Sequence, residues 1–212
     1  MPSIKLGTFV PPDQPPPRAW QRMLSGRRLD LLNPSPGDVA IEDIAHGLAR
    51  VARWNGQTVG AHAFSVAQHA LIVEEIAAAL SPGLEPMWRL AALLHDAPEY
   101  VIGDLNSPFK AAIGLDYKAF EHRLLAAIHS RFRLPYPLPE AVAAGIKRAD
   151  RVAAFHEATR LAGFSQDEGQ RYFGPVESLP GPLAAALSAL EAAPATLMQQ
   201  RFLERFAELT AG

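Results

Sequence analysis

The chain has 212 residues, with 20 Lys and Arg against 22 Asp and Glu, a formal charge of −2, and 49% hydrophobic residues. This composition excludes a disordered chain and disfavours nucleic-acid polymers as partners, and the absence of cysteine excludes disulfides, thiolate nucleophiles and cysteine-ligated zinc. No apolar run approaches the ~18 residues of a membrane span and no secretory signal opens the chain, so we expect no membrane partner and a cytoplasmic location.

Proline is concentrated at the N-terminus, where eight of the 19 prolines lie within the first 40 residues. We therefore expect residues 1–37 to form an irregular arm with one short extended piece at 28–32. From Ile41 onward apolar residues recur with helical period, which predicts one helical domain over residues 38–212. The expected helices span 41–52, 64–80, 86–100, 117–132, 139–163, 183–192 and 195–209. No strand alternation and no repeat occurs, so the sequence predicts an all-α fold of six to eight helices.

The third expected helix carries an imidazole and two carboxylates, His95, Asp96 and Glu99, directly after the apolar run 90–94. Burying ionised carboxylates beside a core is costly unless a partner or a metal ion compensates. His95 and Glu99 are four residues apart and share a helix face. Pro98 removes a backbone donor within the pattern, which indicates that the helix ends or distorts there.

Two further candidate ligands, His69 and Asp150, lie on core-facing stripes of other expected helices. Each alone is more often a satisfied structural residue. With His95 and Asp96 they supply two imidazoles and two carboxylates from three helices. This donor set suits one divalent metal ion, and Mn, Co, Fe, Ni, Zn and Mg all remain open. No phosphate-binding glycine loop, dinucleotide-binding fingerprint, nucleophile elbow or His-Glu-x-x-His motif competes with this interpretation.

The order of these ligands resembles the HD-domain superfamily of metal-dependent phosphohydrolases. Residues 103–110 read Gly-Asp-Leu-Asn-Ser-Pro-Phe-Lys, which is similar to the Gly-Asp-Leu-Pro-Ser/Thr-Pro-x-Lys loop of the bacterial 5′-deoxynucleotidase branch. The Arg53-Trp54 pair matches the Arg-Trp that this branch places at its substrate pocket. The resemblance covers about residues 41–160 and leaves out the C-terminal helices within 181–210. The chain departs from the family pattern at Gln68, Ala70 and Asn106, none of which is a metal ligand in that pattern.

The resemblance implies an HD-type helical bundle and a role for each matching residue. It makes Glu99 and Asp104 the catalytic carboxylates, places Arg53 and Lys110 at the phosphate, and packs Trp54 on the sugar or base. The metal ligands would be His69, His95, Asp96 and Asp150. The implied activity is removal of phosphate from a small-molecule nucleotide, foremost a deoxynucleoside 5′-monophosphate. Because related proteins are often dimers, a homodimer through the apolar C-terminal helices is a further expectation.

Three alternatives stay open at the level of sequence. The same metal site suits a deoxynucleoside triphosphate triphosphohydrolase. A non-catalytic nucleotide-binding regulatory module would keep the fold, but it has no need of two carboxylates beside a bound anion. An HD-type di-iron oxygenase predicts a second metal with a ligand role for His122 or His129. We interpret His122, His129 and His156 as structural or solvent-exposed and expect a mononuclear site.

Overall fold

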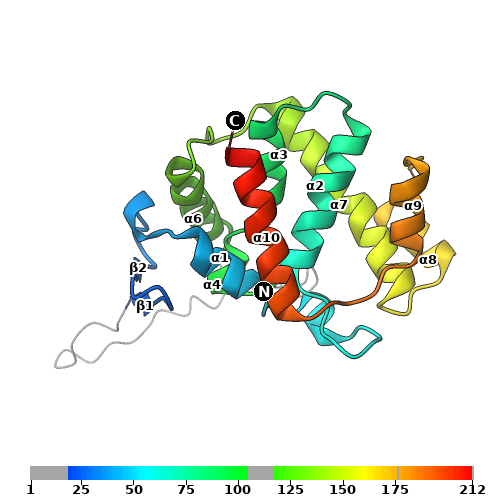
Figure 1. The fold of residues 1–212 in the computed structure, drawn as a ribbon, viewed down its shortest axis with the longest axis horizontal. Helices are drawn as coiled ribbons and strands as arrows, with labels where there is room; N and C mark the ends of the chain where they lie inside the picture. The colour runs from blue at the N-terminus through cyan, green and yellow to red at the C-terminus, as the bar shows by residue number, and fades with distance from the viewer. Residues whose placement is uncertain (1–18, 105–116, 176, 212) are drawn as a thin grey trace, which may run out of the picture.

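The computed structural model describes residues 19–104, 117–175 and 177–211. Within these ranges the chain forms nine α-helices and one two-stranded hairpin, which confirms the all-α prediction (Figure 1). The helices are α1 (Ile41–Leu48), α2 (Val66–Leu80), α3 (Pro86–Leu93), α4 (Glu99–Ile102), α6 (Tyr117–Arg131), α7 (Glu140–Arg160), α8 (Gln166–Phe173), α9 (Gly181–Ser188) and α10 (Ala195–Thr210). Two 3₁₀ turns lie at Pro36–Asp38 and Arg53–Gly56. None of the described helices combines the length and apolar character that a membrane span requires.

The central element is α2, which packs against α7, α3 and α10. Ser65 caps its start by accepting a hydrogen bond from the Gln68 backbone N–H at 3.2 Å. Apolar side chains then occupy nearly every face, and Val66, Val73 and Ile76 are fully buried. A helix that is apolar on all sides belongs in the interior, so any polar residue on it needs an internal partner.

The prediction of one helix over residues 86–100 is wrong, because the structure divides it into α3 and α4. Helix α3 ends at Leu93, and Leu94 leaves the helical conformation with φ −99° and ψ 8°. Pro98, at the N-cap of α4, lacks a backbone N–H, and its ring would clash with the carbonyl four residues earlier in a continuous helix. His95 and Asp96 therefore lie in a turn between the two helices.

The N-terminal segment contains a hairpin that the sequence did not predict in full. Strand β2 (Arg28–Asp30) is the extended piece expected at 28–32, but β1 (Trp20–Arg22) pairs with it in antiparallel register. Leu29 of β2 is fully buried, so the hairpin contributes to the core. Helix α8 was also not predicted, because it is short and carries no apolar stripe, although Ser165 and Glu168 form a capping box at its start.

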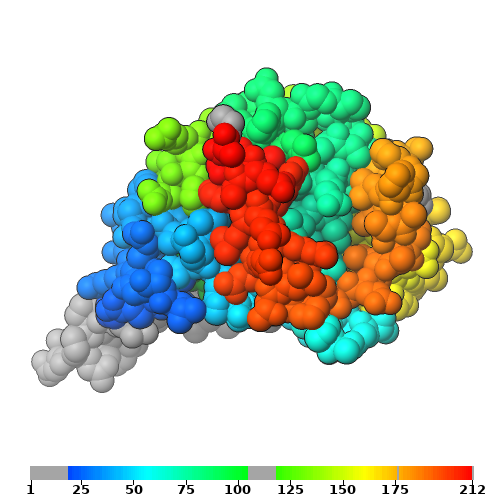
Figure 2. All heavy atoms as spheres, viewed as in Figure 1, coloured from blue at the N-terminus to red at the C-terminus, as the bar shows by residue number. Residues whose placement is uncertain are grey.

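Helix α10 is fixed to the central helix by a buried ion cluster. On the face shown in Figure 2, α10 lies at the surface between α6 and the hairpin on one side and α2 and α3 on the other. The fully buried Glu74 of α2 accepts hydrogen bonds from Arg205 of α10, at 2.9 Å for both Nε and Nη2, and from Arg89 of α3. Such a pair is charge-assisted and specific in geometry. It joins α2, α3 and α10.

Helices α1 and α4 approach closely at Gly47, and we expect Gly47→Ala to destabilise the protein by about 1–3 kcal/mol. A Cβ at this position would lie 2.8 Å from Tyr100 Cβ and 2.9 Å from the Tyr100 carbonyl oxygen, and the backbone cannot yield as a flexible side chain would. Urea unfolding measures the change. The control is Gly145→Ala in α7, where nothing lies within 4 Å of the added Cβ. There the gain in helix propensity is up to about 1 kcal/mol. Equal stabilities of the two variants would contradict the close packing.

Candidate metal centre

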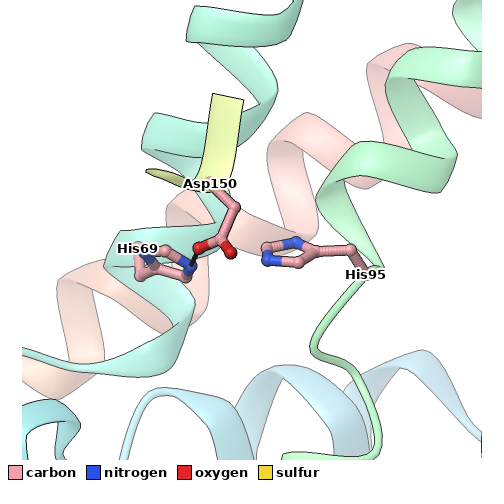
Figure 3. A group of neighbouring side chains, drawn as sticks. All are labelled: His69, His95 and Asp150. Atoms are coloured by element: carbon pink, nitrogen blue, oxygen red, sulfur yellow. Dashed lines mark ion pairs between the residues drawn. The ribbon is translucent and has the colours of Figure 1, made fainter. Parts of the chain in front are cut away.

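Four side chains from three segments gather at one point inside the helical domain. His69 comes from α2, His95 and Asp96 from the turn after α3, and Asp150 from α7. The potential ligand atoms of His69, His95 and Asp150 all lie within 4.8 Å of one another. In Figure 3 the Asp150 carboxylate points between the two imidazole rings. His69 Nε2 is 3.3 Å from Asp150 Oδ1 and 3.4 Å from Asp96 Oδ2, and His95 Nε2 is 3.2 Å from Asp96 Oδ2.

Both imidazoles turn the same ring nitrogen, Nε2, toward the carboxylates. His95 Nδ1 donates to the Ala92 carbonyl oxygen at 2.8 Å, and His69 Nδ1 donates to Glu157 Oε1 at 2.5 Å. Carbonyl and carboxylate oxygens only accept, so each Nδ1 carries a proton. Among the described residues, neither buried Nε2 has a hydrogen-bond partner. In the neutral rings two Nε2 lone pairs thus face carboxylate oxygens. A divalent cation would accept electron pairs from both Nε2 atoms and from the carboxylate oxygens, so the residues present fit such an ion.

Sequence reasoning missed Glu157, which is fully buried behind His69. Its Oε2 accepts from Arg53 Nε and from Trp54 Nε1, each at 2.9 Å, while Oε1 serves His69. Burial opposes its ionisation, but the charges of Arg53 and His69 outweigh that effect and lower the pKa of Glu157 to about 2. Its position seven residues after Asp150 places both on one Ala-rich face of α7, which is the pattern that could have revealed it.

The carboxylates around the two rings make the centre attractive to positive charge. Burial and the Arg53 charge lower the pKa of His69, but Glu157, Asp150 and Asp96 outweigh both and hold it well above its ordinary value. Burial likewise opposes ionisation of Asp96, yet His95 and His69 keep the pKa of Asp96 well below its usual range. Protons and a metal ion therefore compete for the same Nε2 atoms, as they do wherever imidazoles ligate a metal.

The Arg53–Trp54 pair forms the start of a left-handed turn beside this centre. Trp54 and Asn55 have φ of 56° and 50°, which costs non-glycine residues free energy and requires support from the surroundings. Arg53 Nη1 lies 3.7 Å from Asp96 Oδ2. The Trp54 ring packs against Phe164 and Phe173, with ring centroids 5.7 and 5.9 Å apart. The Trp54 ring, which the resemblance places on a sugar or base, thus already packs against two aromatic side chains of the protein.

The remaining predicted site residues divide into those described and those outside the described ranges. Glu99 is buried at the first position of α4, and its N–H donates to the Asp96 carbonyl at 3.0 Å. Asp104 lies near Arg53: burial lowers the pKa of Arg53, but the charges of Glu157, Asp96, Asp104 and Asp150 raise it. Lys110 and the rest of the 105–110 loop lie outside the described residues.

Within the described residues, the side chains that could hold a metal ion form the group of His69, His95 and Asp150. His122, His129 and His156 do not belong to this group. His129 Nδ1 donates to the Pro135 carbonyl at 2.9 Å, and burial lowers its pKa. His122 is exposed on α6. His156 is half-buried, and burial followed by the Arg160 charge lowers its pKa.

Comparison with known proteins gives one relationship of high identity. The chain is 62% identical to an uncharacterized protein of Rhodobacter capsulatus over 157 residues, which make up 74% of this chain and 80% of that protein. No protein-family model matches the chain. Because this relative is uncharacterized, it places the chain in a family but indicates no activity.

Proposed function

This chain belongs to the same protein family as the Rhodobacter capsulatus relative, and we propose that it is a metal-dependent phosphohydrolase that removes phosphate from nucleotides, foremost deoxynucleoside 5′-monophosphates. The observation that carries the proposal is the convergence of two imidazole Nε2 atoms and two aspartates, with both rings fixed through Nδ1. The order of these residues and the Gly-Asp-Leu loop, which resemble HD-domain phosphohydrolases, support nucleotide phosphate as the substrate.

The ligands would be His69, His95, Asp96 and Asp150. A divalent ion bound there supplies a Lewis acid for the phosphoryl oxygens and lowers the pKa of a water molecule. In our proposal Glu99 takes the proton of the water that attacks phosphorus, and the bond from phosphorus to the ester oxygen breaks. Asp104, protonated, then donates to the departing 5′ alkoxide. Two buried or crowded carboxylates with different protonation states suit this division of roles.

Arg53 contributes to phosphate binding through its Nη groups alone. Its Nε is engaged by Glu157, and Nη1 faces Asp96 at 3.7 Å. Because Glu157 offsets one positive charge, the arginine orients a phosphate oxygen more than it neutralises a dianion. A divalent ion held by the four ligands would add two positive charges that Asp96 and Asp150 offset, so the resemblance leaves Lys110 as the second cation for the phosphate.

The test is phosphate release by metal-stripped protein to which single divalent metals are returned. With deoxynucleoside 5′-monophosphates we expect orthophosphate that depends on the added metal. His95→Ala should be inactive, which excludes a contaminating phosphatase, whereas His122→Ala, an exposed histidine on α6, should keep the wild-type rate.

The products and controls also decide between the alternatives. Release of triphosphate from deoxynucleoside triphosphates would move the substrate class to triphosphohydrolysis. Two metal ions per chain together with loss of metal in His122→Ala would favour an oxygenase. Metal-loaded protein that binds nucleotides and hydrolyses none of them would overturn the proposal and leave a binding module.

A further inference from the structure

We propose that Glu157 is the positioning residue of the metal centre, where a single buried carboxylate sets the His69 ring and holds the Arg53–Trp54 turn beside it. This inference rests on the proposed function, because it assumes that His69 Nε2 binds a metal ion. It adds a residue to the site that is absent from the predicted ligand, catalytic and substrate-binding sets.

Both oxygens of the Glu157 carboxylate accept hydrogen bonds from neighbouring side chains. Oε1 accepts from His69 Nδ1 at 2.5 Å, and Oε2 accepts from Arg53 Nε and Trp54 Nε1 at 2.9 Å each. The Glu157 side chain has no exposed area, so water cannot replace a lost partner. All three donors therefore depend on one side chain for their orientation.

The two histidines of the centre are fixed in different ways. His95 donates to a backbone carbonyl, that of Ala92, which no substitution removes. His69 donates to a side chain, that of Glu157. A carboxylate on Nδ1 keeps the proton there, leaves the Nε2 lone pair for the metal ion, and makes the ring a stronger ligand. The hydrogen bond that fixes the His69 ring is therefore the one that a side-chain substitution can remove.

Helix α7 contributes to the site in two ways, through Asp150 and through Glu157. Asp150 and Glu157 are seven residues apart on one helix face, so α7 supplies one ligand and the support for a second from α2. The other carboxylate oxygen holds Arg53 with its Nε turned inward and its Nη1 toward Asp96. A change at Glu157 should accordingly affect metal binding and the placement of the arginine together.

The decisive variant is Glu157→Gln, because a glutamine side chain keeps the shape but has only one acceptor oxygen. It cannot accept from His69 and from the Arg53–Trp54 pair at once. We expect the affinity for Mn²⁺, measured by calorimetry, to fall about 10- to 100-fold. The matched control is Glu74→Gln, which alters an equally buried carboxylate of α2 that binds Arg89 of α3 and Arg205 of α10. It should lower stability and leave the Mn²⁺ affinity within about threefold of wild type, since it lies outside the hydrogen-bonded partners of the site.

A second readout reports the His69 ring directly. In zinc-loaded wild-type protein we expect an exchange-protected His69 Nδ1–H proton in the NMR spectrum, shifted downfield by its carboxylate acceptor. In Glu157→Gln this resonance should move upfield or exchange with solvent, and in Glu74→Gln it should stay in place. If Glu157→Gln does not fold, the wild-type spectrum decides. A His69 ring proton on Nε2, or an Nδ1–H that exchanges as fast as a ring proton of the exposed His62, would overturn the inference.

These measurements need metal and protein but no substrate, so the two proposals can fail separately. Dependence of metal affinity on Glu157 in a protein that releases no phosphate would overturn the proposed function and support the role of Glu157. Unchanged Mn²⁺ affinity and an unchanged ring proton in Glu157→Gln, with phosphate release intact, would overturn the role of Glu157 and support the proposed function.

Discussion

Asp150→Asn is expected to abolish stable metal binding and, with it, hydrolysis. The substitution keeps the size of the side chain but removes the carboxylate that faces His69 Nε2 at 3.3 Å. Loss of a supporting residue already costs metal sites about 10- to 100-fold in affinity, so loss of a charged ligand should exceed about 100-fold. Because metal catalysis contributes several kcal/mol to the transition state, activity should fall by about 100- to 10,000-fold.

Calorimetry with Mn²⁺ and phosphate release measure these two effects. A thermal unfolding experiment gives an independent reading, because an ion at 100 times its dissociation constant stabilises the folded protein by about 2.7 kcal/mol. That stabilisation should disappear in Asp150→Asn. The control, Glu140→Gln, changes an exposed carboxylate in the first turn of the same helix and should retain both the affinity and the thermal shift. Full metal affinity in Asp150→Asn would remove this residue from the site.

The residues of the candidate centre were identifiable from sequence because each breaks a local rule. His69 lies on the core-facing stripe of a largely apolar helix, and His95 and Asp96 follow a buried run directly. A polar group in such a place must have a partner. The pattern, however, says nothing of which groups meet. That His69 and Asp150 face one another follows from the packing of α2 on α7, which local spacing does not contain.

The contacts of Glu157 and Trp54 likewise could not be predicted from the sequence. Glu157 looks like any acidic residue on a long helix until its neighbours on α2 and on the Arg53–Gly56 turn are known. The resemblance places Trp54 on the sugar or base of the substrate, and only the structure shows that its indole N–H and ring also contact Glu157, Phe164 and Phe173. Tertiary partners of this kind have no period and no fixed spacing in the chain.

Gln68, one of the positions where the chain differs from the HD-domain pattern that it resembles, has a structural role of its own. Gln68 is buried beside His69, and its amide donates to the Glu191 carbonyl at 2.7 Å and accepts from the Ala193 N–H at 3.0 Å. Both bonds reach the segment that precedes α10. The side chain next to a candidate ligand thus anchors the C-terminal part of the chain to α2, a role that requires an amide with both a donor and an acceptor.

Glu99→Gln is expected to separate the chemistry from the metal. Glu99 begins α4 and is only 3% exposed, and the turn that holds it also holds Asp96, whose carbonyl accepts its N–H. A glutamine side chain has nearly the same shape but cannot take a proton from water. If Glu99 is the general base, kcat should fall by about 100- to 10,000-fold. Metal affinity should stay at the wild-type value, in contrast to Asp150→Asn.

The comparison of the two variants under identical conditions makes the assignment sharp. Phosphate release at saturating deoxynucleoside monophosphate gives kcat, and Mn²⁺ calorimetry gives the affinity. A matched control is Asp43→Asn, a buried carboxylate on α1 that accepts from the Ser25 N–H at 2.9 Å and should leave kcat unchanged. A wild-type kcat in Glu99→Gln would exclude Glu99 as the base. Loss of both kcat and metal would instead make Glu99 a ligand, because a residue that acts only on the proton of the attacking water contributes nothing to holding the ion.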